Sequence, residues 1–201
     1  DLTVTGVQTC ALPIFIANST GAVTASDTAT VAEATTIDAF AKAVVFAVSD
    51  TAAAIAASSS NALDEATSVT ASDTATTAQA DTISAFATAV VYNVSGTAAE
   101  IVAASADARN EAVNITITDD ATIAQATTAE NASNSGTVTV ATITDTAANI
   151  TASTNAVIAN STGAVTASNT ATTAQAGTMS ALDTAVVYNV SGTAAEIVAA
   201  S

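Results

Sequence analysis

The chain contains no histidine and no tryptophan, and only one cysteine, one proline and one methionine among 201 residues. Its only cations are Lys42 and Arg109 against 18 carboxylates, which gives a net charge of −16. The residues of a histidine-based nucleophile system, a zinc site or a basic phosphate site are therefore missing, so we expect no enzyme and no cofactor. An acidic surface repels polyphosphates, so we also expect no nucleic-acid partner.

Long apolar runs are absent as well, although the chain is apolar as a whole. Thr, Ser and Asp interrupt every apolar stretch before the roughly 18 residues that a membrane-spanning helix needs, so we expect no membrane insertion. Half of the residues are hydrophobic, 10% are charged and the mean hydropathy is +0.49. That composition is too apolar for a disordered coil and predicts a folded chain that buries many small side chains.

The N-terminal residues differ from everything that follows. Residues 4–14 read VTGVQTCALPI, which resembles the translation of a common sequencing adapter, whereas residues 16–26 recur unchanged at 158–168. We interpret residues 1–14 as an adapter-derived artefact and residues 15–201 as a single repeat solenoid truncated at both ends. The alternative is a genuine N-terminal strand with an apolar tail.

Internal repetition is the strongest feature of the sequence. Residues 88–105, TAVVYNVSGTAAEIVAAS, return without change at residues 184–201. A short motif of Ser or Thr, then Asp, Asn or Gly, then Thr or Asp, then Ala recurs about every 23 residues, and we call its second residue the anchor. The anchors are Asp27, Asp50, Asp73, Gly96, Asp119, Asp145, Asn169 and Gly192. Eight such units, of alternating odd and even type, predict a solenoid, because each unit must bury its apolar face against its neighbours.

Within a unit, the pattern predicts one strand and one helix. Residues two and four before each anchor are apolar and the residues between them are mostly polar, which indicates a strand with one buried face. Ala-rich residues follow the anchor, and Asp, Asn and Gly are preferred N-cap residues. We therefore expect a right-handed α/β solenoid of about eight 23-residue coils whose anchors lie one above another. The Thr-rich odd units leave an all-β right-handed β-helix as the alternative.

Two features of this arrangement suggest ligands. Hydroxyl residues would form two ranks on the outer face of the sheet, which resembles the ice-binding face of solenoid antifreeze proteins. The candidate residues are Thr24, Ser26, Thr70, Ser72, Thr116, Thr118, Thr142, Thr144, Thr166 and Ser168. Stacked anchor carboxylates could also hold calcium, but Gly96, Asn169 and Gly192 interrupt the column. Helix capping is the simpler interpretation of the anchors.

The repeats also resemble those of a known kind of protein. The even units VSDTAAAIAAS (residues 48–58) and ITDTAANITAS (143–153), alternating with ATIAQATT (121–128), resemble repeats of very long secreted bacterial proteins of the β-strand-repeat, haemolysin-type or adhesin-like kind. The resemblance covers residues 15–201. It implies a structural spacer or stalk at an extracellular or cell-surface location, whose partners are other repeats of the same parent chain. Because the sequence ends at Ser201 without a polar cap, we also expect end-to-end self-association.

Overall fold

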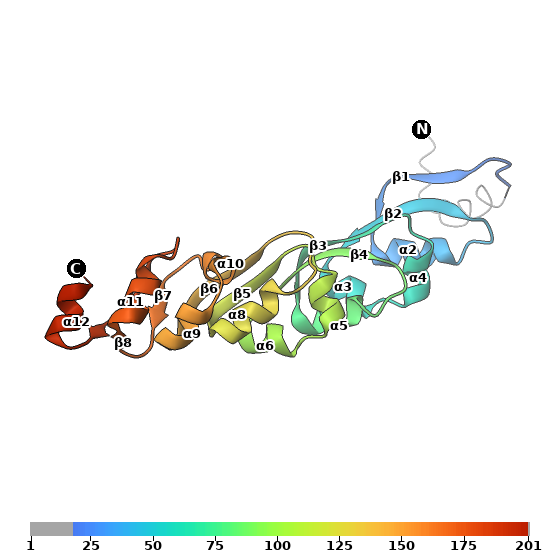
Figure 1. Cartoon of the computed structure of the whole chain (residues 1–201). Helices are drawn as coiled ribbons and strands as arrows, with labels where there is room; N and C mark the ends of the chain where they lie inside the picture. The colour runs from blue at the N-terminus through green and yellow to red at the C-terminus, as the bar shows by residue number, and fades with distance from the viewer. Residues whose placement is uncertain (1–17, 201) are drawn as a thin grey trace, which may run out of the picture.

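The computed structural model describes residues 18–200, so the predicted artefact at residues 1–14 lies outside the described residues. Within residues 18–200, eight strands form one parallel sheet in the order in which they follow along the chain. They are β1 (Val23–Ala29), β2 (Val44–Asp50), β3 (Val69–Thr76), β4 (Val90–Gly96), β5 (Ile115–Ala121), β6 (Val138–Asp145), β7 (Val165–Ala167) and β9 (Val186–Val187). Near the C-terminal end, β8 (Ala171–Thr172) and β10 (Val190–Ser191) form a second, two-stranded parallel sheet. Figure 1 shows the elongated body that results.

Helices alternate with the strands in both types of unit. Odd units contain one helix, namely α2 (Val31–Asp38), α5 (Thr77–Ile83), α8 (Ile123–Glu130) or α11 (Thr173–Ser180). The described even units contain two short helices, namely α3 (Ala52–Ala57) and α4 (Ser60–Asp64), α6 (Ala98–Ala103) and α7 (Ala106–Asn110), or α9 (Ala147–Ala152) and α10 (Asn155–Ala159); α12 (Ala194–Ala199) follows β10. The predicted α/β class is confirmed, and the all-β alternative is wrong because the Thr-rich odd units also form helices.

Threonine begins these helices, and the anchor does not. The N-cap of the first helix in each unit is a Thr whose hydroxyl accepts a hydrogen bond from the backbone N–H three residues later. These caps are Thr30, Thr51, Thr76, Thr97, Thr122, Thr146, Thr172 and Thr193. Our prediction that the anchor caps the helix of its own unit is therefore wrong. The T-x-x-E/Q spacing of the capping box is present in six units, and it correctly indicates that the Thr is the N-cap.

The strands pair in a register that the repeat length does not give. Val48 lies opposite Val69 and Val94 lies opposite Ile115, each 21 residues further along the chain. The expected stacking of anchors is wrong as a consequence, because Asp50 lies opposite Ala71. A 23-residue register would also place Val48 opposite Ala71, whereas the observed register packs β-branched side chains against each other in the core.

The strands of odd units contain bulges, which take up the residues by which the repeat exceeds the 21-residue register. Thr70 pairs with Val91 and Thr74 pairs with Asn93, so four residue steps along β3 match two along β4. The same shift occurs between Thr24 and Thr28 of β1. A bulge leaves its extra residues outside the ladder and redirects their side chains. The odd anchors Asp27, Asp73 and Asp119 lie in these stretches.

The core lies between the sheet and the helices. Val48, Val69 and Val94 of the strands are at most 1% exposed, and Ile55 and Ile101 of the helices are fully buried. Tyr92 is buried as predicted, and its hydroxyl donates to the backbone oxygen of Ala108 at 2.9 Å. Burial raises the pKa of Tyr92, so the phenol stays protonated and keeps donating.

Candidate functional site: the outer sheet face and the coil joints

The first candidate site is the outer face of the sheet. Thr24, Thr70, Thr116 and Thr166 lie on β1, β3, β5 and β7. These threonines do not pair with one another, because the strands on both sides belong to even units. The pairs are Thr70 with Ser49 and Val91, Thr116 with Ser95 and Thr139, and Thr166 with Thr144 and Val187. Of the predicted residues, the ladder brings together Thr144 and Thr166.

The other predicted residues leave this face irregular. Ser26, Ser72 and Thr118 lie in the bulged stretches of β1, β3 and β5, and Ser168 lies between β7 and β8. Thr142 donates its hydroxyl to Asp120 at 2.9 Å. Exposed valines stand among the hydroxyls, with exposed fractions of 46% for Val45, 51% for Val91 and 61% for Val187. The face is therefore a staggered mosaic of Thr, Ser and Val rather than two continuous ranks.

The second candidate site is the anchor column. The anchor side chain accepts a hydrogen bond from the first N–H of the preceding unit's helix. The bonds are Val31 N to Asp50 Oδ2 (3.0 Å), Ala52 N to Asp73 Oδ1 (2.6 Å), Ala98 N to Asp119 Oδ1 (2.7 Å), Ile123 N to Asp145 Oδ2 (2.9 Å) and Ala147 N to Asn169 Oδ1 (2.7 Å). The first N–H groups of a helix have no partner within the helix and attract negative charge. Each of these anchors therefore joins its own unit to the helix of the preceding unit.

The charges around these joints are held by hydrogen bonds. Burial alone would raise the pKa of Asp145, but hydrogen bonds from the Asn149 side chain and from the backbone of Thr146 and Ile123 hold it below its usual value. The carboxylates of Glu33, Glu100 and Glu196 accept from the backbone N–H and the hydroxyl of their N-cap threonines. Those bonds, the backbone ones first, lower the pKa of each Glu.

Two anchors lack a side chain. At Gly96, an added Cβ would lie 3.0 Å from the Thr77 methyl group and 3.2 Å from a Glu100 carboxylate oxygen. At Gly192, it would lie 2.8 Å from the Thr173 methyl group and 3.2 Å from a Glu196 carboxylate oxygen. A side chain at either position would therefore need one or both of these neighbouring side chains to shift.

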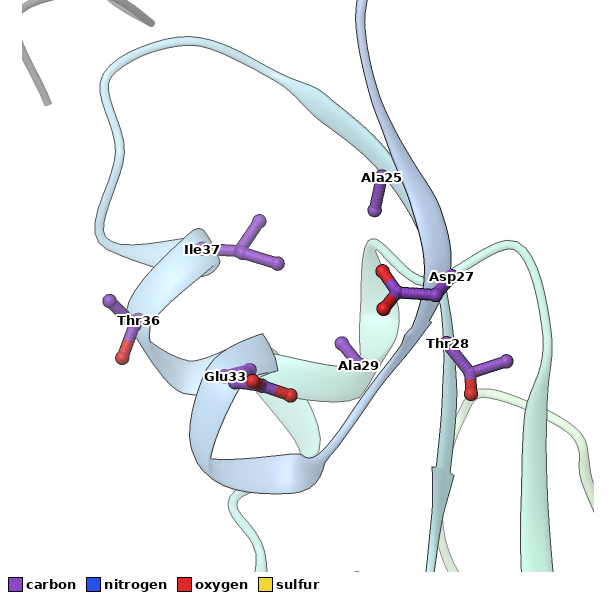
Figure 2. Close-up of a pocket in the computed structure, with 7 residues that line it drawn as sticks. All are labelled: Ala25, Asp27, Thr28, Ala29, Glu33, Thr36 and Ile37. Carbon is purple, nitrogen blue, oxygen red and sulfur yellow. The ribbon is translucent and has the colours of Figure 1, made fainter. Parts of the chain in front are cut away.

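A pocket lies between β1 and α2, in the first described unit. Ala25, Asp27, Ala29 and Ile37 line it, and Figure 2 shows the Asp27 and Glu33 carboxylates beside it. Among residues 18–200, Asp27 is the one carboxylate anchor with no hydrogen bond to a helix N-terminus.

Other ligand classes find little support in the described part of the chain. Residues 18–200 contain no cluster of three or more acidic, histidine or cysteine side chains arranged for a metal ion. In the same range, no helix is both long and apolar enough to cross a bilayer. Calcium binding stays an untested prediction.

Comparisons with known proteins add no assignment. No protein-family model, curated protein or solved structure matches the chain.

Proposed function

We propose that this chain is a structural spacer: an α/β solenoid of about eight 23-residue coils, from a secreted or surface-attached adhesin-like bacterial protein. It has no catalytic role, and its partners are other repeats of the same parent chain. The sheet supports the solenoid part of the proposal, because its strands follow in chain order and helices lie between successive strands.

One observation carries the spacer role: the most regular polar side chains of the repeat bind the protein itself. The anchors accept from the preceding helix, and the Thr hydroxyls cap their own helices. A binding repeat would instead be expected to present its recurrent polar groups to a ligand. Because these recurrent groups hold neighbouring units together, they support a role in which the repeat provides length and stiffness.

The observed register favours the spacer over ice binding. An ice-binding face needs hydroxyls at even spacing along continuous ranks, but Val91 and Val187 follow Thr70 and Thr166 in the ladder. The staggered face therefore offers short rows only.

Thermal hysteresis near the freezing point tests the two functions against each other. We expect no more hysteresis than an equal concentration of an unrelated acidic protein produces. Hysteresis that disappears in a Thr116→Tyr, Thr142→Tyr and Thr166→Tyr variant, but not in a Thr20→Tyr variant off the sheet, would replace the spacer by an ice-binding solenoid.

A further inference from the structure

One odd unit inside the array differs from the others just after its helix. In the other three odd units, a large apolar residue follows the helix, donates its N–H back to the last turn and packs against the core. These residues are Phe40, Phe86 and Leu182. After α8 the same place is taken by Ala132, whose N–H donates to Ala129 O. This unit is also longer, since Asp119 and Asp145 are 26 residues apart whereas the preceding anchors are 23 apart.

A pocket of about 390 Å³ lies beside Ala132, between the end of α8 and the start of β6. Glu130, Asn134 and Asn160 bring polar side chains to it, and Ala132 and Val138 contribute apolar surface. A volume of this size is typical of small-molecule sites.

The loop that forms one side of this pocket is held against the preceding unit. Ser133 N donates to Asn110 Oδ1 at 3.0 Å, and Gly136 N donates to Val113 O at 2.8 Å. A Cβ added at Gly136 would lie 2.6 Å from Val113 O, so glycine is what permits this close approach. The pocket is therefore formed without a ligand, which lowers the cost of binding one.

The amide donors at the pocket are already used within the protein. Asn134 Nδ2 donates to Val113 O at 3.1 Å, and Asn160 Nδ2 donates to Glu130 Oε2. Both partners can only accept, so they fix the orientation of the two amides. Asn134 Oδ1, Asn160 Oδ1 and Glu130 Oε1 have no hydrogen-bond partner among residues 18–200.

Thr137, which also lines the pocket, adds no spare donor, because its hydroxyl donates to Asn114 Oδ1 at 3.0 Å. A ligand that fits these free oxygens must itself donate hydrogen bonds, and the net charge of −16 favours a cation. A bare Ca²⁺ ion fits less well, because it takes about six to eight oxygens in a close shell. The pocket is wide and is lined by a single carboxylate.

We propose that this pocket binds a primary ammonium group on a short aliphatic stem. An ammonium group only donates, and its N–H groups match the free oxygens of Glu130, Asn134 and Asn160 one to one. The stem lies over Ala132 and Val138. The site belongs to one unit of the array and does not depend on the spacer role.

NMR of the full chain, titrated with butylammonium chloride at constant ionic strength, tests the site. We expect saturable shifts of the Asn134 and Asn160 side-chain amides. Tetramethylammonium, which has the charge but no N–H donor, should not produce them. Nα-acetyl-lysine amide carries the same ammonium group on a peptide unit. Its binding would extend the site to a lysine of a protein partner, whereas butylammonium binding alone would restrict the site to free amines.

Variants connect the shifts to this pocket. Glu130→Gln keeps an oxygen for Asn160 but removes the charge, and it should raise the Kd for butylammonium about tenfold, as expected for a hydrogen bond to a charged group. Ala132→Phe introduces the residue that Phe86 provides after α5, and it should fill the pocket and abolish binding. Glu65→Gln, an equal charge change at an exposed residue, should bind as the wild type does.

Three results would each overturn the site: no saturable shifts, equal shifts with tetramethylammonium, or unchanged binding by Glu130→Gln. Calcium that displaces butylammonium at lower concentration would also overturn it, in favour of a metal site. Thermal unfolding followed by circular dichroism shows whether each variant folds, and Glu130→Gln decides the matter if Ala132→Phe does not. Loss of the ammonium site with normal unfolding would leave the spacer proposal intact.

Discussion

Replacing Asp119 by Ala tests whether the anchors hold the coils together. Asp119 Oδ1 accepts from the first N–H of α6, that of Ala98, at 2.7 Å, and Ala98 is 2% exposed. The substitution leaves this N–H without its acceptor. The expected loss of unfolding free energy is about 1–2 kcal/mol, from the cost of losing a helix-capping acceptor and of a hydrogen bond to a charged group. Asp119 itself is exposed, which holds the value to the lower part of that range.

Hydrogen exchange at the Ala98 amide, together with urea unfolding, measures this effect at the joint and across the array. The amide should lose protection in Asp119→Ala. Asp119→Asn should retain most of it, since Asn169 accepts from Ala147 N at the same distance of 2.7 Å. If Asn is as harmful as Ala, the charge rather than the hydrogen bond carries the effect. If neither variant changes protection or stability, the anchors do not stabilise the joints.

Two further predictions follow from matched positions. Ile101→Ala should lower the free energy of unfolding by about 2–5 kcal/mol, because it leaves a cavity in the core. Ile197→Ala, in an identical segment but half exposed, should lower it by under about 1 kcal/mol. Urea unfolding of the monomer measures both losses, and equal losses would contradict the burial of Ile101 by the next unit. Hydrogen bonds lower the pKa of three capping-box carboxylates, so the folded chain binds fewer protons than the unfolded chain. The stabilisation that these carboxylates provide should be lost as the pH falls below about 4.5. Thermal unfolding midpoints measured from pH 6 to 3 should show this loss, and replacement of the three Glu residues by Gln should make the midpoint depend less on pH. These carboxylates are those of Glu33, Glu100 and Glu196.

The class of the fold is readable from the sequence because its signals are local. Alternation of apolar and polar residues around Val94 and Tyr92 predicts the strand with its buried face, and the Ala-rich run at residues 98–103 predicts the helix. Both are present, as β4 and α6. Their repetition at a near-constant interval is enough to predict parallel strands in chain order.

The joints between coils were not predictable in the same way. Asp73 precedes a helix and is a residue type that favours an N-cap, so its local sequence points to α5 of its own unit. Its actual partner, the Ala52 N–H, lies 21 residues earlier and belongs to the preceding coil. Asp73 lies within the bulge between Thr70 and Thr74, and nothing in the periodicity of one unit indicates where extra residues leave the ladder.

The candidate outer-face ranks were misplaced for the same reason. The prediction assumed that Thr70 lies opposite the residue 23 positions further along the chain, which is Asn93. Thr70 instead pairs with Val91, 21 positions further along. A register error of two residues does not by itself move a side chain to the other face, since strands alternate with a period of two. It changes the neighbours, so predicted inward residues such as Val48, Val69 and Val94 are buried although the ranks were misplaced. The prediction of burial was not correct throughout: Ala71 is only half-buried, and in β6 Val140 is buried where Ala141 was predicted.

The glycine anchors are explained by repulsion between two carboxylates, one at the anchor and one at the third residue of the helix that follows it. In an even unit the anchor lies beside two helices: it faces the first N–H of the preceding helix and the third residue of its own helix. A carboxylate at both positions would place two negative charges within a few ångströms, because a Cβ at Gly96 would already lie 3.2 Å from a Glu100 oxygen. The four even units avoid this: Asp50 accompanies Ala54, Asp145 accompanies Asn149, Gly96 accompanies Glu100 and Gly192 accompanies Glu196. Asn149 even donates to Asp145 at 2.7 Å. Each even unit thus has at most one carboxylate at these two positions, and the two glycine anchors occur in the units whose carboxylate lies on the cap, that of Glu100 or Glu196.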